Sequence, residues 1–272
     1  MIIGIDFGTS NTDIVISDNG DKEFFSMPSE QINDEILDKI LHYIDVDTTN
    51  LEKIAVTGGK SSDLSNSIKN IPIIKVNEVD AIGYGALELY DLKNKPFVAV
   101  SAGTGTACIF HDDNKFNHLG GISIGGGTLL GLSNYILNTT EVSELEELSQ
   151  KGNRQNLDLL IGEAVNEIGS LYPEISASNF LKGRSSKDHN PSDIAASLSN
   201  MIGEVIGTIA YLNAIVCGQK EVYFMGRTSQ IETIKKGIED RLKLANINGI
   251  FEENREYGNV LGALRALQQK QL

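Results

Sequence analysis

The sequence predicts a mixed α/β protein built from two lobes of similar architecture. Short apolar strands, joined by polar or glycine-rich turns, alternate with amphipathic helices along the 272 residues. Three strands followed by alternating helices and strands occur at the start of the chain, and the same order begins again near residue 97. We therefore expect a first lobe at residues 1–95 and a second at 96–272 that carries a helical insertion. Clefts between domains are common ligand sites, so we expect a ligand between the lobes.

The first lobe is predicted from strand alternation, one hairpin turn and one helical period. Asp18-Asn19-Gly20 is typical of a hairpin turn, and Lys93-Asn94-Lys95-Pro96 ends the lobe because it breaks the preceding helix. Apolar residues three and four apart predict a helix near 29–43. The predicted strands lie at 1–8, 13–16, about 23–25, 53–56 and 71–76, and the last helix at 78–89.

The second lobe repeats this order with longer helices. Asn190-Pro191-Ser192 is a helix start signal, and the apolar helix that follows is either buried or an interface. A turn at Asp112-Asp113-Asn114 separates two of the strands. The predicted strands are 97–102, 107–111, one near 116, 221–225 and 247–251. One predicted helix begins near 126 and leads into the helical insertion, which reaches about 160. The other predicted helices are 192–216, 231–244 and 258–269.

Composition excludes several functional classes. The formal net charge is -14, with 23 basic against 37 acidic residues and no basic run, so we expect no nucleic-acid partner. Cys108 and Cys217 lie in apolar runs and are predicted to be core residues. The four histidines lack metal-ligand spacing. No apolar stretch approaches a membrane span by this interpretation, and Asp6 interrupts the first apolar run. We expect a cytoplasmic protein without a membrane partner.

The first turn has the residues that a magnesium nucleotide needs. Asp6 ends an apolar strand and is followed by Gly8-Thr9-Ser10-Asn11-Thr12. A carboxylate there holds the metal, usually through water, while turn amides and hydroxyls meet phosphates. The alternative is an aspartate that only caps its own turn.

Two glycine clusters in the second lobe suggest a second anion site. Gly103-Thr104-Gly105-Thr106 joins two strands, and Gly125-Gly126-Gly127 precedes a predicted helix. Glycines let backbone amides approach an anion, and free amides at a helix start favour a negative ligand. The alternative is a pair of ordinary glycine turns.

Glu78 and Asp80 begin the helix after the fifth strand. A carboxylate at this place can accept the proton of a substrate hydroxyl that attacks a phosphate. Acidic residues in a first helical turn also serve simply to complement the helix dipole, so both interpretations stay open.

Together these residues resemble the type II pantothenate kinases, members of the acetate/sugar kinase, heat-shock chaperone and actin superfamily. The resemblance covers nearly the whole chain and rests on motifs in the same order. They are Ile5-Asp6-x-Gly8, Val56-Thr57-Gly58-Gly59, Glu78-x-Asp80-Ala81, Gly103-Thr104-Gly105-Thr106, Gly120-Gly121-Ile122-x-x-Gly125-Gly126-Gly127, Gly131-Leu132 and Tyr223-Phe224-Met225-Gly226.

The resemblance implies two duplicated actin-like (ribonuclease H-like) domains with a nucleotide cleft, and ATP- and Mg²⁺-dependent phosphorylation of pantothenate by a homodimer. It implies Glu78 as general base and Asp6 as the magnesium residue acting through water. It implies His118 as a second catalytic residue, and Asp80, Gly120 and Gly121 as substrate-binding residues. The implied ATP contacts are Asp6, Gly8, Thr9, Ser10, Asn11, Thr12, Thr104, Gly105, Gly126, Gly127, Thr128, Gly226 and Thr228.

Three positions depart from the family pattern. Thr9 replaces a glycine, giving a loop like that of the chaperones and actin, and Asp13 stands where a lysine is expected. His118 stands where the family has an arginine, and either contacts the substrate or ends a strand. The departures leave three alternatives open: a changed acceptor such as pantetheine, another kinase of the superfamily such as an amino-sugar kinase, or an impaired ATP-binding paralogue.

Overall fold

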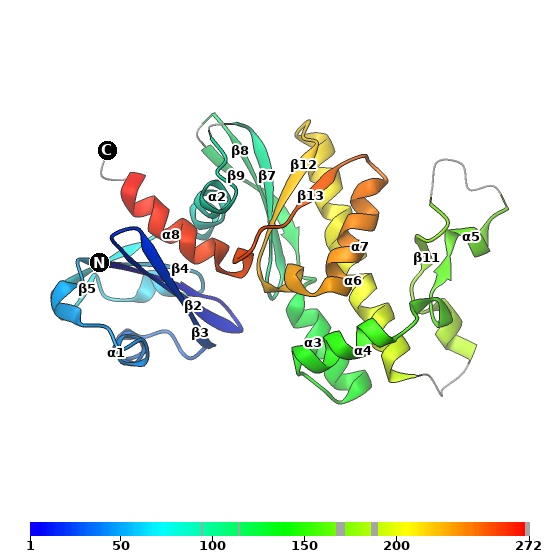
Figure 1. Cartoon of the computed structure of the whole chain (residues 1–272), viewed down its shortest axis with the longest axis horizontal. Coiled ribbons are helices and arrows are strands. Elements are labelled where there is room, and N and C mark those ends of the chain that lie inside the picture. The colour runs from blue at the N-terminus through cyan, green and yellow to red at the C-terminus, as the bar shows by residue number, and fades with distance from the viewer. Residues whose placement is uncertain (94, 114, 167–171, 186–189, 270–272) are drawn as a thin grey trace. The chain divides into compact units, whose positions relative to one another are not determined.

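The computed structural model describes residues 1–93, 95–113, 115–166, 172–185 and 190–269, whose strands form three sheets (Figure 1). The first sheet has the order β3-β2-β1-β4-β6-β5, the second β13-β12-β7-β8-β9, and β10 pairs with β11. Within the first sheet, β1 is antiparallel to β2 and parallel to β4. The predicted mixed α/β class is confirmed.

The predicted order of elements is also found. The first part contains β1 (Ile2–Phe7), β2 (Asn11–Asp18), β3 (Asp21–Pro28), α1 (Asp34–Tyr43), β4 (Lys53–Thr57), β5 (Ser67–Ile68), β6 (Ile71–Lys75) and α2 (Glu78–Leu89). The second contains β7 (Phe97–Ala102), β8 (Thr106–Asp112), β9 (Lys115–Ile122), α3 (Gly126–Leu137), α4 (Val142–Lys151), β10 (Leu159–Leu160), α5 (Ile161–Ala164), β11 (Ser176–Ser178), α6 (Pro191–Val216), β12 (Glu221–Met225), α7 (Glu232–Lys243), β13 (Asn248–Ile250) and α8 (Gly258–Gln269).

Helix α1 begins five residues later than predicted because Asn33 caps it. The Asn33 side chain accepts a hydrogen bond from the Ile36 amide at 2.9 Å. Asn94 in the predicted break and Asn114 in the predicted turn lie outside the described residues.

Contacts divide the chain into two compact units. The first comprises Met1–Ser101, Ile109–His118 and Glu252–Leu272, and the second Ala102–Cys108 and Leu119–Phe251. The lobe boundary at residue 95 and the cleft between lobes stay predictions.

Strand β1 presents a different environment on each face. Ile3, Ile5 and Phe7 belong to a buried cluster with the apolar side chains of α1. On the other face, Gly4 lies so close to α8 that a Cβ there would be 2.7 Å from Leu264 Cγ. Because side chains alternate along a strand, Asp6 shares the face of Gly4. The acidic residue therefore ends the face that α8 covers.

Helices α2 and α8 pack closely because both carry glycine at their contact. A Cβ on Gly262 of α8 would lie 1.8 Å from the Ala81 carbonyl oxygen and 2.5 Å from the Gly85 amide nitrogen of α2. Asn77 begins α2 by accepting a hydrogen bond from the Asp80 amide at 2.8 Å. This packing and this cap set the position of Glu78.

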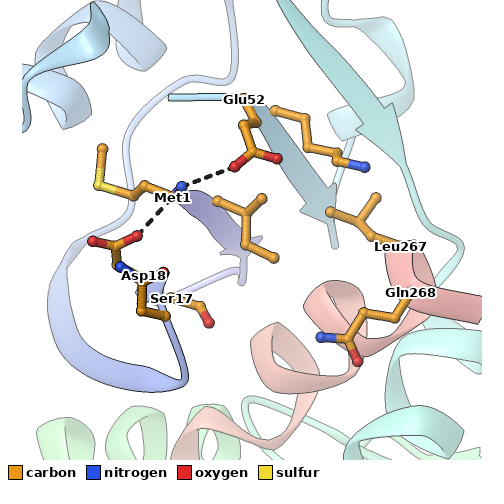
Figure 2. Close-up of a pocket in the computed structure, with 9 residues that line it drawn as sticks. Met1, Ser17, Asp18, Glu52, Leu267 and Gln268 are labelled. Atoms are coloured by element: carbon orange, nitrogen blue, oxygen red, sulfur yellow. Dashed lines mark hydrogen bonds and ion pairs between the residues drawn. The ribbon is translucent and has the colours of Figure 1, made fainter. Parts of the chain in front are cut away.

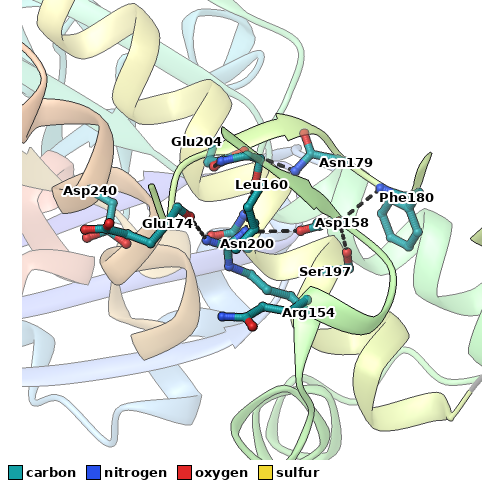
Figure 3. A network of polar contacts seen from close by, with 12 residues as sticks. Arg154, Asp158, Leu160, Glu174, Asn179, Phe180, Ser197, Asn200, Glu204 and Asp240 are labelled. Carbon is teal, nitrogen blue, oxygen red and sulfur yellow. Dashed lines mark hydrogen bonds and ion pairs between the residues drawn. The ribbon is translucent and has the colours of Figure 1, made fainter. Parts of the chain in front are cut away.

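The insertion was predicted to be helical as far as about residue 160. In the structure, the segment between α3 and α6 also contains β10 and β11, which form a small sheet. Buried polar contacts attach it to α6 and α7 (Figure 3). Asp158 accepts hydrogen bonds from the Ser197 hydroxyl and from the Phe180 amide, the latter at 2.9 Å. Glu204 of α6 accepts a hydrogen bond from the Asn179 side chain of the insertion at 3.0 Å and pairs with Arg241 of α7 at 3.1 Å. The insertion is thus held by paired carboxylates as well as by apolar packing.

Helix α6 corrects the expectation that no apolar stretch approaches a membrane span. Among the described residues it alone is long and apolar enough by length and composition, and 67% of its apolar window is buried within the protein. Such burial is typical of a core helix. Its remaining exposed apolar side chains are Val205, Leu212, Ile215 and Val216.

The glycine contact between α2 and α8 generates a test. We expect Gly262→Ala to lower the free energy of unfolding by about 1–3 kcal/mol, because the added methyl group meets backbone atoms. Gly131→Ala is the matched control, since that helical glycine has nothing within 4 Å of its ideal Cβ. The control should be stabilised, by up to about 1 kcal/mol. Urea unfolding measures both, and equal effects would contradict the packing described.

Candidate functional site

Asp6 lies in a polar row that crosses three strands. It pairs in register with Asp13 of β2 on one side and Thr57 of β4 on the other. Directly paired residues in neighbouring strands share a face, so the three side chains lie at one end of the face that α8 covers. Asp13 is only 7% exposed and Thr57 is fully buried. The Thr57 hydroxyl oxygen has no hydrogen-bond partner among the described residues.

The surroundings of Asp6 disfavour its charge. Desolvation, followed by the negative charges of Asp13 and Glu78, raises the pKa of Asp6 to about 7. A hydrogen bond from the Asn259 side chain acts in the opposite direction. The influence of Glu78 shows that the first turn of α2 lies near Asp6. The sequence did predict Asp6 and Glu78, but it contained no signal for Asn259.

Gly58 makes room for the Asp6 carboxylate. It adopts φ +77°, and a Cβ on it would lie 2.3 Å from Asp6 Oδ1. No other residue type fits this approach without moving the carboxylate.

The first turn is tight and is held by Ser29, which sequence reasoning missed. The Ser29 hydroxyl donates to the Gly8 carbonyl at 2.6 Å, and its amide donates to the Ser10 carbonyl at 3.1 Å. The Thr12 hydroxyl lies 3.4 Å from that of Ser29, and Thr12 is buried. Thr12 therefore supports the turn, whereas three residues are at least partly exposed at its tip: Thr9, Ser10 and Asn11.

The second turn is braced by the loop after β12. The Gly103 amide donates to the Gly105 carbonyl at 2.9 Å, and the Thr228 hydroxyl donates to the Gly103 carbonyl at 2.7 Å. Gly226 has φ +89°, and a Cβ on it would lie 2.3 Å from the Ala102 carbonyl oxygen. Thr228 is buried, so its hydroxyl holds this turn.

The start of α3 differs from the sequence interpretation. The Gly126 amide donates to the Gly103 carbonyl at 2.9 Å, and the Gly127 amide donates to the Thr104 carbonyl at 3.0 Å. These amides are therefore not free for an anion, because the second turn already uses them. The Thr128 hydroxyl donates to the Ser123 carbonyl at 3.1 Å. The two glycine clusters form one packed substructure.

The residues predicted for the acceptor divide into two groups. Glu78 and His118 are exposed, the first at the start of α2 and the second on β9. Asp80 instead accepts a hydrogen bond from the Asn77 side chain at 2.6 Å and completes the helix cap. Gly120 adopts φ +102°, and a Cβ on Gly121 would lie 2.3 Å from the Thr106 carbonyl oxygen. Glu78 thus has an accessible carboxylate, and Asp80 has a structural partner.

One pocket lies at the opposite end of β1 from Asp6 (Figure 2). The Met1 ammonium group there is 3.1 Å from Glu52 and 3.4 Å from Asp18. None of the predicted site residues lines this pocket; its lining is Met1, Ile2, Ser17, Asp18, Asn19, Glu52, Lys53, Leu267 and Gln268. Its charged groups are largely paired with one another.

Sequence comparisons assign relatives along almost the whole chain. Residues 84–238 match the Fumble family model. A type II pantothenate kinase of Bacillus cereus (strain AH820) is 29% identical, over 96% of each chain. A type II pantothenate kinase of Staphylococcus aureus (strain USA300) is 26% identical, over 97% of this chain and 98% of the relative. Pantothenate kinase 1 of Arabidopsis thaliana is 39% identical, over 48% of this chain and 37% of the relative.

Solved structures agree on the fold. The (R)-2-hydroxyglutaryl-CoA dehydratase component A of Acidaminococcus fermentans has a TM-score of 0.70 at 18% identity, over 99% of this chain and 98% of that chain. A ROK family glucokinase of Streptomyces griseus, solved with glucose and AMPPNP, has a TM-score of 0.64 at 12% identity, over 98% of this chain and 99% of that chain. These likenesses confirm the predicted actin-like fold.

The environment of Asp6 predicts a pH-dependent stability. Its pKa rises from 3.8 to about 7 on folding, so the native state keeps a proton that the unfolded state loses, and stability falls as pH rises between these values. We expect Asp6→Asn to stabilise the metal-free protein by about 1–3 kcal/mol at pH 8, after discounting for partial exposure, and to have little effect at pH 4.

Urea unfolding at the two pH values measures this difference, with Asp21→Asn as a control at an exposed carboxylate of the same sheet. The same change in stability at both pH values would contradict the environment assigned to Asp6.

Proposed function

The chain belongs to the Fumble family, the family of type II pantothenate kinases, and from that premise we propose that it transfers a phosphoryl group from ATP to the primary hydroxyl of pantothenate. This reaction begins coenzyme A biosynthesis. The observation that carries the proposal is the juxtaposition of Asp6, the first glycine turn and Glu78 in one compact unit. Near-full-length similarity to curated pantothenate kinases supports the same acceptor.

The two glycine turns are assigned to the phosphates. The exposed tip of the first turn presents the Thr9 and Ser10 hydroxyls. In the second turn, the partly exposed Thr104 and Gly105 are assigned to the phosphates, while the Gly103 and Thr104 carbonyls bind the α3 amides. Gly126, Gly127 and Gly226 act by holding the second turn in shape.

Asp6 is assigned to the magnesium ion, through water. Mg²⁺ keeps several waters and takes one or two carboxylates plus phosphate oxygens, and it rarely binds in an all-protein cage. The structure suits this mode, since its described residues include no group of three His, Cys, Asp or Glu side chains that could hold a metal. The unpartnered Thr57 hydroxyl beside Asp6 suits an ordered water. When bound, the ion neutralises charge on the transferring phosphoryl group.

Glu78 is assigned as the general base. Its carboxylate is exposed at the first residue of α2, where it can accept the proton of the acceptor hydroxyl as that oxygen attacks phosphorus. Asp13 and His118 supply no permanent positive charge where the family has a lysine and an arginine. Pantetheine lacks the carboxylate of pantothenate, so it is the second candidate acceptor.

A homodimer in the cytoplasm is proposed from the same resemblance. The exposed apolar side chains at the carboxyl end of α6 offer a face of the required character. Two members of this face are more than half exposed, Ile215 and Val216.

A coupled ADP-release assay with pantothenate, pantetheine and N-acetylglucosamine tests the proposed reaction. We expect turnover with pantothenate or pantetheine and none with the amino sugar. Turnover only with the amino sugar would favour the other kinase class. ATP binding by calorimetry without turnover of any acceptor would establish an impaired paralogue.

The role of Glu78 gives a sharper prediction. We expect Glu78→Gln to lower kcat by about 10²–10⁴-fold, the usual contribution of general base catalysis, with little change in the affinity for ATP. Glu35→Gln is the matched control, because Glu35 is an exposed carboxylate in the first turn of α1. Steady-state kinetics and calorimetry measure both variants. A kcat unchanged by Glu78→Gln would exclude the assigned role.

A further inference from the structure

Asn259 is the residue through which α8 reaches the proposed magnesium site. It is the second residue of α8, and its side chain forms a hydrogen bond with Asp6. Asp6, Asn259 and α8 all lie in the first compact unit. The polar contact therefore sits at the end of an otherwise apolar helix–sheet interface, where Val260 and Leu264 pack against Gly4.

The orientation of the Asn259 carboxamide is determined by Ser101. The Ser101 hydroxyl donates to Asn259 Oδ1 at 3.3 Å. A primary amide has a carbonyl oxygen that accepts and an NH₂ group that donates. With the oxygen occupied by Ser101, the NH₂ group is the one that meets Asp6, and it donates to the carboxylate. Ser101 belongs to β7.

The position of Asp6 makes this donor important. Asp6 lies at the end of the face that α8 covers, in register with Asp13 of β2. Residues that hydrogen-bond a metal ligand orient it and affect metal affinity nearly as strongly as the ligands do.

We propose that Asn259 is a positioning residue of the nucleotide site, which holds the Asp6 carboxylate in the orientation that binds hydrated Mg²⁺ of the Mg·ATP complex. The inference rests on the proposed function. It assigns Asn259 no contact with substrate, and it makes Ser101 the residue that fixes the amide.

The test measures the magnesium requirement rather than activity alone. Isothermal titration calorimetry follows the binding of a non-hydrolysable ATP analogue at a series of Mg²⁺ concentrations. We expect Asn259→Ala to raise the Mg²⁺ concentration for half-maximal binding by about tenfold. In the kinase assay the same shift should appear, with kcat at saturating Mg²⁺ and KM for the acceptor close to wild type. Ser101→Ala should shift the Mg²⁺ requirement in the same direction by less.

Asn259→Leu separates positioning from packing. It keeps about the size of the side chain but has no donor for Asp6. A positioning role predicts a Mg²⁺ shift like that of Asn259→Ala, whereas a packing role predicts wild-type behaviour. Asn33→Ala is the matched control, since this asparagine at the start of α1 caps its own helix. It should lower the melting temperature and leave the Mg²⁺ requirement unchanged.

The outcomes distinguish this inference from the proposed function. Wild-type protein that binds the analogue in a Mg²⁺-dependent manner, with Asn259→Leu unchanged, overturns the inference alone. Wild-type protein that shows no Mg²⁺-dependent nucleotide binding overturns both. If Asn259→Ala fails to fold in a thermal melt, Asn259→Leu, which fills a similar volume, decides the question.

Discussion

The alternation of side chains along β1 is the constraint on which the site depends. One face of the strand enters the apolar core with α1, and the other meets α8. Asp6 belongs to the second face and lies at its end, where the apolar contacts stop and polar partners begin. A shift of one residue in register would place this carboxylate in the core beneath α1, where no charged group is accommodated.

The glycines of this chain serve close packing at least as much as ligand access. Gly262 allows α2 and α8 to touch, and Gly58 leaves space for the Asp6 carboxylate. Gly126 and Gly127 let the start of α3 bind the carbonyls of the second turn. Hydrogen bonds from a neighbouring helix, added to the turn's own, make the turn rigid, and a rigid turn holds its exposed groups ready for a phosphate.

The local electrostatics around Asp6 are unusually negative for a site assigned to a nucleotide. Asp13 and Glu78 both raise the pKa of Asp6. A bound cation would offset this charge, which links nucleotide binding closely to magnesium in the proposed reaction. In the second unit, by contrast, the buried carboxylate of Glu204 is paired with an arginine inside the protein. Asp6 thus lies near other carboxylates, whereas Glu204 lies beside a cation.

Local signals in the sequence determined most elements and several site residues. Short apolar runs and helical periodicity predicted β1, α2, β12 and α8, since these local patterns do not depend on distant parts of the chain. Glycine and hydroxyl residues after Asp6 predicted the first turn, because few other residue types form it. The small β10–β11 sheet was missed because two- and three-residue strands have no measurable period.

Only the tertiary structure decided which polar groups are available for binding. The Gly126 and Gly127 amides donate to carbonyls of the second turn, and the Asp80 carboxylate accepts a hydrogen bond that completes a helix cap. The tertiary structure also brought Ser29, Thr57, Ser101 and Asn259 to the turns and to Asp6 from distant parts of the chain. Hydrogen-bond partners far apart in sequence leave no periodic or compositional trace, so sequence could locate the carboxylate of this site but not the residues that orient it.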